Sequence, residues 1–255
     1  MKHVYGPVAS WRLGKSLGID LLCSPGKTCS FECVYCQLDK TDKITIERKK
    51  FIKIPELIKD VKEALKKSEP DVLTLSGMGE PTLAKNMSEA IDEIKKITDI
   101  PVAILTNSTL FYKKEVRDAL KKVDIIIAKL DASNSEIFKK INRPAEGIIF
   151  EKTLKNIKKL REEFKGKFAL QIMFMNKNKE YAKEIADIAR EINPDEVQIN
   201  TPIRPCNIKP LSVEELDRIE KEFSGLNALS VYHSEKPKTD PIDKIEIFRR
   251  RRKEI

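Results

Sequence analysis

Short apolar runs rich in β-branched residues alternate along this 255-residue chain with longer amphipathic stretches. The runs are continuous rather than alternating, which is typical of strands buried on both faces of a parallel sheet. They predict strands at Gly18–Cys23, Asp71–Gly77, Pro101–Asn107, Asp124–Asp131, Phe168–Met175 and Glu196–Pro202. The amphipathic stretches predict helices at Pro55–Ser68, Ala84–Thr98, Tyr112–Lys122, Phe150–Lys165, Asn178–Asn193 and Ser212–Phe223.

Several of the predicted helices have recognisable ends. Pro55 stands where a helix begins, Pro70 follows a helix, and Ser212 with Glu215 forms a capping box. A succession of strand–helix units implies a parallel sheet with right-handed crossovers and outer helices. The pattern alone allows an incomplete TIM-like barrel or a doubly wound open sheet. In both folds ligands bind at the carboxyl ends of the strands.

The composition is that of a folded globular protein. Hydrophobic residues make up 40% of the chain, and 9 glycines with 13 prolines are too few for a low-complexity sequence. We expect a main domain with an N-terminal extension over residues 1–210, followed by a C-terminal helix and basic tail over residues 211–255. No stretch has the roughly 18 apolar residues of a membrane span, and the N-terminus lacks a signal-peptide pattern. We therefore expect a cytoplasmic protein.

The net charge of +9 favours an anionic partner. Much of the charge lies on stretches where lysine and glutamate alternate, which indicates solvated helix faces. The run from Arg249 to Lys253 has no nearby acid except Glu254, so it is either a frayed tail or a nucleic-acid contact. Aromatic residues, at 6%, are too few to indicate an aromatic RNA-binding module. RNA or another anionic macromolecule is thus a candidate partner on charge alone.

Three of the five cysteines, Cys29, Cys33 and Cys36, lie on one segment after the first predicted strand. An odd number of cysteines in a reducing compartment argues against a disulfide framework. Three thiolates this close can bind one polynuclear metal centre and leave one iron of a cubane cluster open. Two alternatives stay open. A zinc-stabilised binding protein would need a fourth ligand, and an iron–sulfur scaffold or electron carrier would favour a fourth local cysteine.

The spacing Cys29-x3-Cys33-x2-Cys36, with Tyr35 before the last cysteine, resembles the signature of the radical SAM superfamily. The resemblance implies an α/β fold, an incomplete TIM-like (β/α)6 barrel of parallel strands with outer helices. It also implies a [4Fe–4S] cluster on the three cysteines and S-adenosylmethionine as the second cofactor, with Tyr35 among the residues that bind it.

A second segment supports this resemblance. Ser76-Gly77-Met78-Gly79-Glu80-Pro81, at the end of the second predicted strand, resembles the Gly–Glu motif of the superfamily. The resemblance implies that Gly77 and Gly79 allow close backbone approach to the cofactor and that Glu80 holds the amino group of its methionine moiety. A glycine-rich turn with Glu80 as a first-turn helix charge is the structural alternative.

The implied chemistry is that of an enzyme. One electron, delivered by an external donor of flavodoxin or ferredoxin type, breaks a carbon–sulfur bond of S-adenosylmethionine. The products are methionine and a 5′-deoxyadenosyl radical that takes a hydrogen atom from the substrate. Oxidoreductase, lyase and transferase classes all stay open. His3 and His233 are the only histidines, which leaves little material for histidine-centred acid–base catalysis, and no catalytic side chain is assigned.

Flanking segments resemble more closely the radical SAM proteins grouped with tRNA wyosine synthases. These segments are Tyr5-Gly6-Pro7-Val8, Arg12 to Leu21, Tyr35-Cys36-Gln37-Leu38, Ile141-Asn142-Arg143-Pro144 and Asn200 to Pro205. Wyosine synthases carry a second cluster on additional N-terminal cysteines, whereas only Cys23 precedes the motif here. The resemblance therefore implies the radical chemistry, with tRNA as one candidate substrate. A radical SAM activase of a partner protein and a methylating or sulfur-handling enzyme are the alternatives.

Polar residues at other strand ends complete the candidate site. Asn107, Asp131 and Asn200 are candidate contacts of the cofactor, although Asn107 also suits an ordinary turn and Asp131 a helix N-cap near Ser135. The candidate substrate contacts are Arg12, Cys23, Arg143 and Cys206. A surface role for the Arg143 side chain and inert structural roles for the two thiols are the alternatives.

Overall fold

The computed structural model describes residues 2–38 and 40–251 of the chain. Its main sheet has eight strands in the order β1-β2-β5-β6-β7-β8-β9-β10. The strands are β1 (Val4–Ser10), β2 (Gly14–Ile19), β5 (Val72–Leu75), β6 (Val102–Thr106), β7 (Ile125–Lys129), β8 (Lys167–Met173), β9 (Glu196–Asn200) and β10 (Ala228–Ser230). β1 runs antiparallel to β2, and every other neighbouring pair is parallel.

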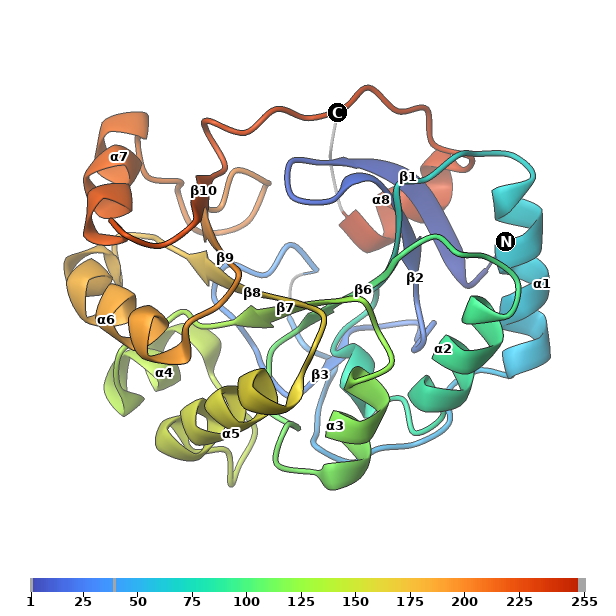
Figure 1. The fold of residues 1–255 in the computed structure, drawn as a ribbon, viewed down its shortest axis with the longest axis horizontal. Helices are drawn as coiled ribbons and strands as arrows, with labels where there is room; N and C mark the ends of the chain where they lie inside the picture. Colours follow the sequence, from blue (N-terminus) through green and yellow to red (C-terminus); the bar gives the residue numbers. More distant parts are fainter. Residues whose placement is uncertain (1, 39, 252–255) are drawn as a thin grey trace.

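Helices cover the outside of this curved sheet (Figure 1). They are α1 (Ile54–Leu65), α2 (Met87–Lys95), α3 (Lys114–Leu120), α4 (Ser135–Asn142), α5 (Phe150–Glu163), α6 (Ala182–Ile192) and α7 (Val213–Glu222), whereas α8 (Lys244–Arg251) lies beside β1. From β2 to β9 the strands follow one another in sequence order, without the reversal of a doubly wound sheet. The predicted incomplete barrel of parallel strands and outer helices is therefore confirmed.

The first predicted strand was placed too late in the sequence. The run expected at Gly18–Cys23 is β2, which begins at Gly14 and ends at Ile19. Lys15 and Ser16 made its first half look like a loop, but their backbone pairs with β1 on one side, and Ser16 also pairs with β5 on the other. The hairpin strand β1 and the short strand β10 were missed because neither forms a continuous β-branched apolar run.

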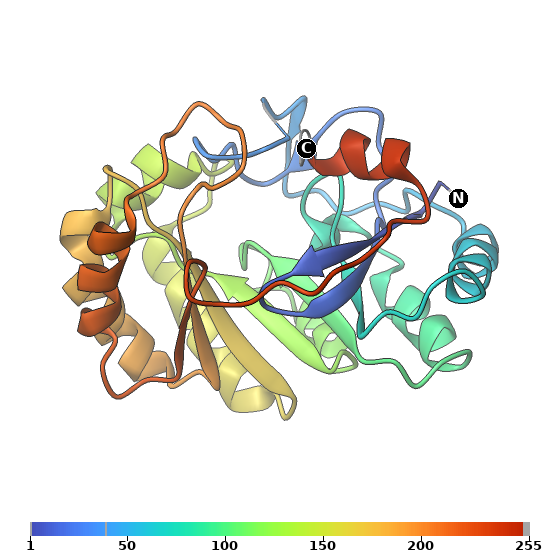
Figure 2. The same ribbon diagram turned by 90° about the horizontal axis from the view of Figure 1, so that it is seen from above.

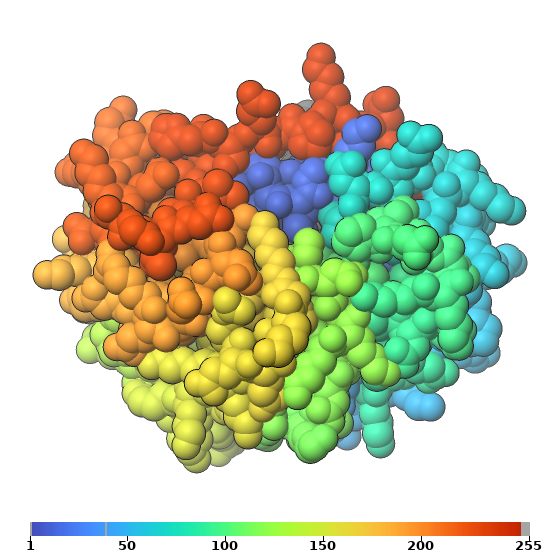
Figure 3. Space-filling view, viewed as in Figure 1, coloured from blue at the N-terminus to red at the C-terminus, as the bar shows by residue number. Residues whose placement is uncertain are grey.

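The C-terminal segment lies along the open side of the barrel, beside the N-terminal hairpin (Figures 2 and 3). The Ile242 N–H donates to the Gly6 carbonyl at 2.7 Å, and the Thr239 hydroxyl donates to the Pro7 carbonyl at 3.2 Å. Residues 249–251 of the basic run belong to α8 rather than to a frayed tail. Residues 252 and 253 of that run lie outside the described residues.

The core lies between the sheet and the helices. Its largest fully buried side chains include Leu73, Leu75, Phe111 and Phe168. Within the described part of the chain, no helix combines the length and the apolar character needed to cross a membrane. Apolar burial on the outer face of the sheet leaves the carboxyl ends of the strands free for polar side chains.

Candidate active site

The three cysteines lie on the segment that follows β2 and returns across the mouth of the barrel. Cys29 ends β3 (Thr28–Cys29), which pairs with β4 (Lys43–Ile44) and so closes the segment into a loop. The Thr28 N–H donates to the Met78 carbonyl at 3.0 Å, and the Thr28 carbonyl accepts from the Glu80 N–H at 3.1 Å. The cysteine loop is thus bonded directly to the glycine turn after β5.

The same loop is also bonded to the end of α4. The Glu32 N–H donates to the Asn142 carbonyl at 3.0 Å, and the Val34 N–H donates to the Ile141 carbonyl at 2.9 Å. Because backbone bonds hold the loop from two sides, its shape does not depend on a metal ion alone.

The spacing of the sulfur atoms tests which metal centre the loop fits. Among the described residues, the sulfur atoms of Cys29, Cys33 and Cys36 are not all within 4.8 Å of one another. A single zinc ion with Zn–S bonds of about 2.3 Å would bring its thiolates to about 3.8 Å from one another. The three sulfur atoms are therefore not placed as one tetrahedral zinc ion would hold them. All five cysteines are free.

Donors surround these sulfur atoms. The Asn107 amide donates to the Cys29 sulfur at 3.5 Å, and the Asn142 amide donates to the Cys33 sulfur at 3.5 Å. Lys27, only 3% exposed, lies beside them. Its burial would lower the pKa of Lys27, but the sulfurs of Cys36, Cys29 and Cys33 raise that pKa above its ordinary value. A buried cation and amide donors stabilise the negative charge of a thiolate-bound cluster.

The glycine turn after β5 combines unusual backbone geometry with a buried carboxylate. Gly77 and Gly79 both have φ of +145°, a conformation that favours glycine. Glu80 is 2% exposed, and burial raises the pKa of its carboxyl group. Its oxygens accept from the Thr82 N–H and hydroxyl at 3.1 and 2.6 Å, the Thr106 hydroxyl at 2.7 Å and the Asn107 N–H at 2.7 Å. Glu80 therefore ties together the ends of β5 and β6.

Replacing Gly79 with alanine should damage the site more than any strain of the backbone alone would. An added Cβ would lie 1.6 Å from the Thr28 carbonyl oxygen, so the cysteine loop must separate from the turn. We expect a loss of more than about 3 kcal/mol in the free energy of unfolding, measured in urea. Gly147→Ala is the matched control, because Gly147 has φ of +81° but no atom within 4 Å of the added Cβ. It should cost about 1 kcal/mol, and equal losses in both variants would contradict the prediction.

Asp131 is the hub on the other side of the loop. Its side chain is fully buried and accepts from the Tyr35 hydroxyl, the Asn142 amide at 2.8 Å and the Met173 N–H at 2.8 Å. Lys129 pairs with it at 3.1 Å, and the Lys129 ammonium lies 4.8 Å from the centre of the Tyr35 ring. Asn134, not Asp131, caps α4. Burial and the charge of Asp131 raise the pKa of Tyr35 well above its ordinary value, so the phenol stays a donor.

Two adjoining cavities lie inside the barrel. A cavity of about 250 Å³ has Tyr35, Cys36 and Asn200 in its wall, and a cavity of about 210 Å³ has Gly77 and Gly79 in its wall. Arg12 lines both. The fold thus gathers these six sequence-predicted residues around one interior space. Neither cavity is lined by Glu80, Asn107 or Asp131, which hold the surrounding loops instead.

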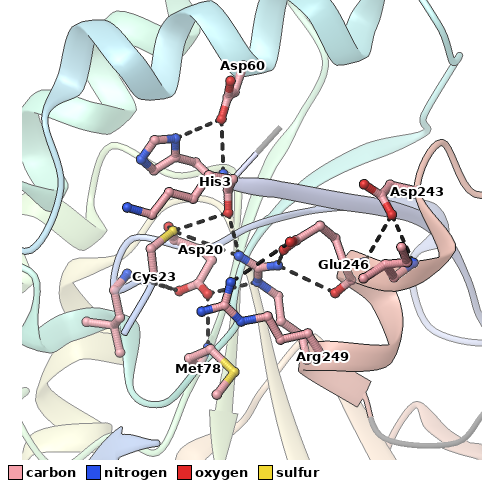
Figure 4. A network of polar contacts seen from close by, with 12 residues as sticks. His3, Asp20, Cys23, Asp60, Met78, Asp243, Glu246 and Arg249 are labelled. Carbon is pink, nitrogen blue, oxygen red and sulfur yellow. Dashed lines mark hydrogen bonds and ion pairs between the residues drawn. The ribbon is translucent and has the colours of Figure 1, made fainter. Parts of the chain in front are cut away.

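The other candidate substrate contacts lie away from these cavities. Arg143, exposed at the end of α4, has φ of +45°. The Cys206 thiol donates to the Ile208 carbonyl at 3.4 Å. The Cys23 thiol donates to the Asp20 carbonyl at 3.1 Å within the polar network of Figure 4, and burial raises its pKa to about 12.

Three polar residues of the site were not predicted from the sequence. Lys27 stands two residues before the first cysteine, and this position beside the loop was the available signal. Asn142 and Arg204 lie in segments that were noted for their resemblance but given no role. Their contacts with Cys33 and with Gln37 join parts of the chain that are far apart in sequence.

Comparisons with known proteins show the family to which the chain belongs. The family model of the radical SAM superfamily matches residues 23–189. A UPF0026 protein of Methanocaldococcus jannaschii is 37% identical over 235 residues, which are 89% of this chain and 72% of that protein. A Brachyspira hyodysenteriae protein named GTPase Obg is 41% identical over 231 residues, which are 88% of this chain but only 34% of that protein. This chain thus spans about a third of that relative.

Solved structures share the fold at low sequence identity. Streptococcus suis SuiB bound to S-adenosylmethionine has a TM-score of 0.66 and 17% identity, over 86% of this chain and 50% of that chain. Archaeal TYW1 has a TM-score of 0.54 and 14% identity, over 84% of this chain and 72% of that chain.

The family match and the site together define a class of iron–sulfur enzymes that use S-adenosylmethionine. The chain belongs to the radical SAM superfamily and, within it, to the family of UPF0026 proteins. Cofactors of the superfamily are a [4Fe–4S] cluster and S-adenosylmethionine. In this chain Cys29, Cys33 and Cys36 would hold the cluster.

Proposed function

We propose that this chain reductively cleaves S-adenosylmethionine and uses the resulting radical to modify a substrate held inside the barrel. The observation that supports the proposal best is the direct bonding of the three-cysteine loop to the glycine turn through Thr28 and Gly79. When bound, the cluster and S-adenosylmethionine would supply one-electron cleavage of a carbon–sulfur bond, which would release methionine and leave a radical able to take a hydrogen atom from the substrate.

The residues of the chain bind, orient and exclude water. Gly77 and Gly79 present bare backbone to the cavity that we assign to the methionine moiety, and Tyr35 and Asn200 line the cavity that we assign to the adenosine moiety. Asp131 fixes the Tyr35 ring through its hydroxyl group. Lys27 supplies a positive charge beside the cysteine sulfurs and so favours the reduced, more negative cluster.

The test is anaerobic reconstitution with iron and sulfide, followed by dithionite and S-adenosylmethionine. We expect the brown colour of an iron–sulfur protein, acid-labile sulfide, and formation of 5′-deoxyadenosine and methionine in equal amounts. Colourless protein with bound zinc would overturn the proposal in favour of a binding protein. A reduced cluster that leaves S-adenosylmethionine intact would overturn it in favour of a scaffold or electron carrier.

Glu80→Gln separates a positioning role from direct cofactor contact. Four donors of the chain already occupy the Glu80 oxygens, about as many as a carboxylate accepts. We propose that Glu80 positions the glycine turn, whose backbone receives the amino group of the cofactor. The variant should lose about 1–3 kcal/mol in the free energy of unfolding. At a temperature where the variant is folded, it should bind the cofactor with the affinity of the wild type. Lost cofactor binding without lost stability would instead show direct contact. Glu63→Gln, on an exposed helix face, is the control.

The substrate and the electron donor belong to the same proposal. We propose a flavodoxin- or ferredoxin-type protein as donor, because the chemistry needs one electron at a time. The resemblance to wyosine synthases and the +9 charge make bulk tRNA the first macromolecule to add. Arg250 is 2% exposed and paired with Asp20, so this part of the basic run adds nothing to the attraction of RNA. If tRNA is the substrate, adding it should raise the rate of 5′-deoxyadenosine formation. A nucleoside of the tRNA should then differ in mass from the same nucleoside before the reaction.

A further inference from the structure

The two cavities inside the barrel are walled by cations. Arg12 and Arg204 line both cavities, Lys129 and Lys236 line the cavity beside Cys36, and Arg250 lines the other. No carboxylate is found among the described residues that line either space. An interior lined in this way attracts anions and repels cationic ligands.

Two of these cations are already neutralised by buried acids. Lys129 pairs with Asp131 at 3.1 Å. Arg250 pairs with Asp20 at 2.8 Å and with Glu246. Arg12 and Arg204 are the described cations that line both cavities.

Arg12 is incompletely satisfied by the protein. Its Nε atom is buried and has no hydrogen-bond partner in the described part of the chain. Its Nη1 atom donates to the neutral Gln198 side chain at a long 3.4 Å. The carboxylate of Glu196 favours the charged form of Arg12, but Glu196 already pairs with Lys167 at 2.6 Å. A buried guanidinium donor without an acceptor is costly unless a ligand supplies one.

Arg204 adds a second charge from another element. It follows β9 and donates to the Gln37 side chain at 2.9 Å, next to Cys36. Burial, and then the charge of Arg204, lower the pKa of Arg12 below its ordinary value. The two guanidinium groups thus repel each other, and an anion between them would reduce that repulsion.

We propose that Arg12 and Arg204 form an oxyanion subsite that binds a phosphate or carboxylate group of the substrate. This inference rests on the proposed function, because it assumes that the substrate enters the barrel. Planar guanidinium forks match the geometry of both oxyanions.

The carboxylate of S-adenosylmethionine is a second source of the same chemistry, and the position of Arg12 argues against it. Arg12 lies in the turn between β1 and β2, at the amino end of β2, and reaches across the open side of the barrel to β9. The cysteine loop and the glycine turn both follow the carboxyl ends of their strands. The Arg12 backbone therefore lies at the end of the barrel opposite to the cysteine loop, whereas Arg204 lies beside Cys36, so the titration below keeps the cofactor carboxylate as one of its outcomes.

Isothermal titration of the reconstituted protein tests this subsite, with pyrophosphate and citrate as probes in the presence of S-adenosylmethionine. At least one probe should bind the wild type. Arg12→Gln and Arg204→Gln should each weaken it by about 10- to 100-fold, the loss expected for a charged hydrogen bond. Arg12→Lys should retain part of the affinity. Arg190→Gln is the control, because Arg190 is an exposed arginine on α6. The affinity for S-adenosylmethionine should be the same in all variants.

Three results would overturn the subsite. The first is that the wild type binds neither probe. The second is that the two glutamine variants bind the probes as tightly as the wild type. The third is that these variants lose affinity for S-adenosylmethionine in parallel with their loss of probe affinity. The third result would assign the arginines to the cofactor carboxylate. Failure of the radical function is distinguishable, because it would abolish 5′-deoxyadenosine formation in the wild type while anion binding persisted.

Discussion

Cys33→Ala should give a folded protein that assembles no cluster and forms no 5′-deoxyadenosine above background. Backbone bonds from Thr28, Glu32 and Val34 hold the loop, so its fold should survive removal of one sulfur. Two remaining thiolates cannot satisfy three irons of a cubane cluster. We expect the rate of product formation to fall by at least about a thousandfold, measured by chromatography after reduction with dithionite, together with loss of acid-labile sulfide.

Cys206→Ala is the matched control for this experiment. Within the described part of the chain, the one hydrogen bond of the Cys206 thiol goes to the Ile208 carbonyl. Cys206 does not line either cavity. The control should keep the cluster and the full rate. A Cys33→Ala protein that keeps an intact cluster and its activity would show that the iron is held elsewhere.

The barrel strands could be predicted because each is buried on both faces. β6 (Val102–Thr106) and β7 (Ile125–Lys129) are runs of β-branched and aliphatic residues, and burial on both faces imposes that pattern. The three cysteines could be recognised because all three lie within one short segment of the sequence. Both features are local, so the sequence contains all the information they need.

The support of the site could not be predicted because it is assembled across the fold. Asn142 reaches Cys33 from α4. Arg12 reaches Gln198 from the turn between β1 and β2, a hairpin that the sequence pattern did not predict. Asp131 follows the end of β7 by two residues, close to the strand end predicted for it, but the four groups that surround its carboxylate come from β7 and from three separate segments. Only the topology of the barrel brings such partners together.

The basic C-terminal run shows the same limit most clearly. In the sequence its arginines form one undivided positive segment, which suggested either a tail or a nucleic-acid contact. In the structure α8 turns them to different sides. The Arg250 side chain is 0% exposed and the Arg249 side chain is 39% exposed. The helix position, which a short terminal sequence does not fix, decides which arginine is structural.

Arg250→Ala should therefore destabilise the protein by about 3–5 kcal/mol, as expected when one partner of a buried ion pair is removed. The Arg250 guanidinium bonds to the Asp20 carboxylate at 2.8 Å and to the Lys2 carbonyl at 2.5 Å, and it lies 5.2 Å from the centre of the Tyr5 ring. Its loss leaves the buried Asp20 charge unpaired. Urea unfolding measures the effect, and Arg249→Ala, which removes only a distant contact to Glu246, should be within about 0.5 kcal/mol of the wild type.

The destabilisation should also reach the cofactor site, because Asp20 connects the two. Its carboxylate accepts the Met78 N–H at 3.3 Å and the Cys23 N–H at 3.0 Å, and Figure 4 shows it between these residues. Asp20→Asn combined with Arg250→Met should cost less than the sum of the single changes, since neither partner then keeps a buried unpaired charge. Equal stability of Arg250→Ala and Arg249→Ala would refute this role. Non-additive free energies of unfolding for the Asp20 and Arg250 changes would instead show that α8 stabilises the glycine turn through Asp20.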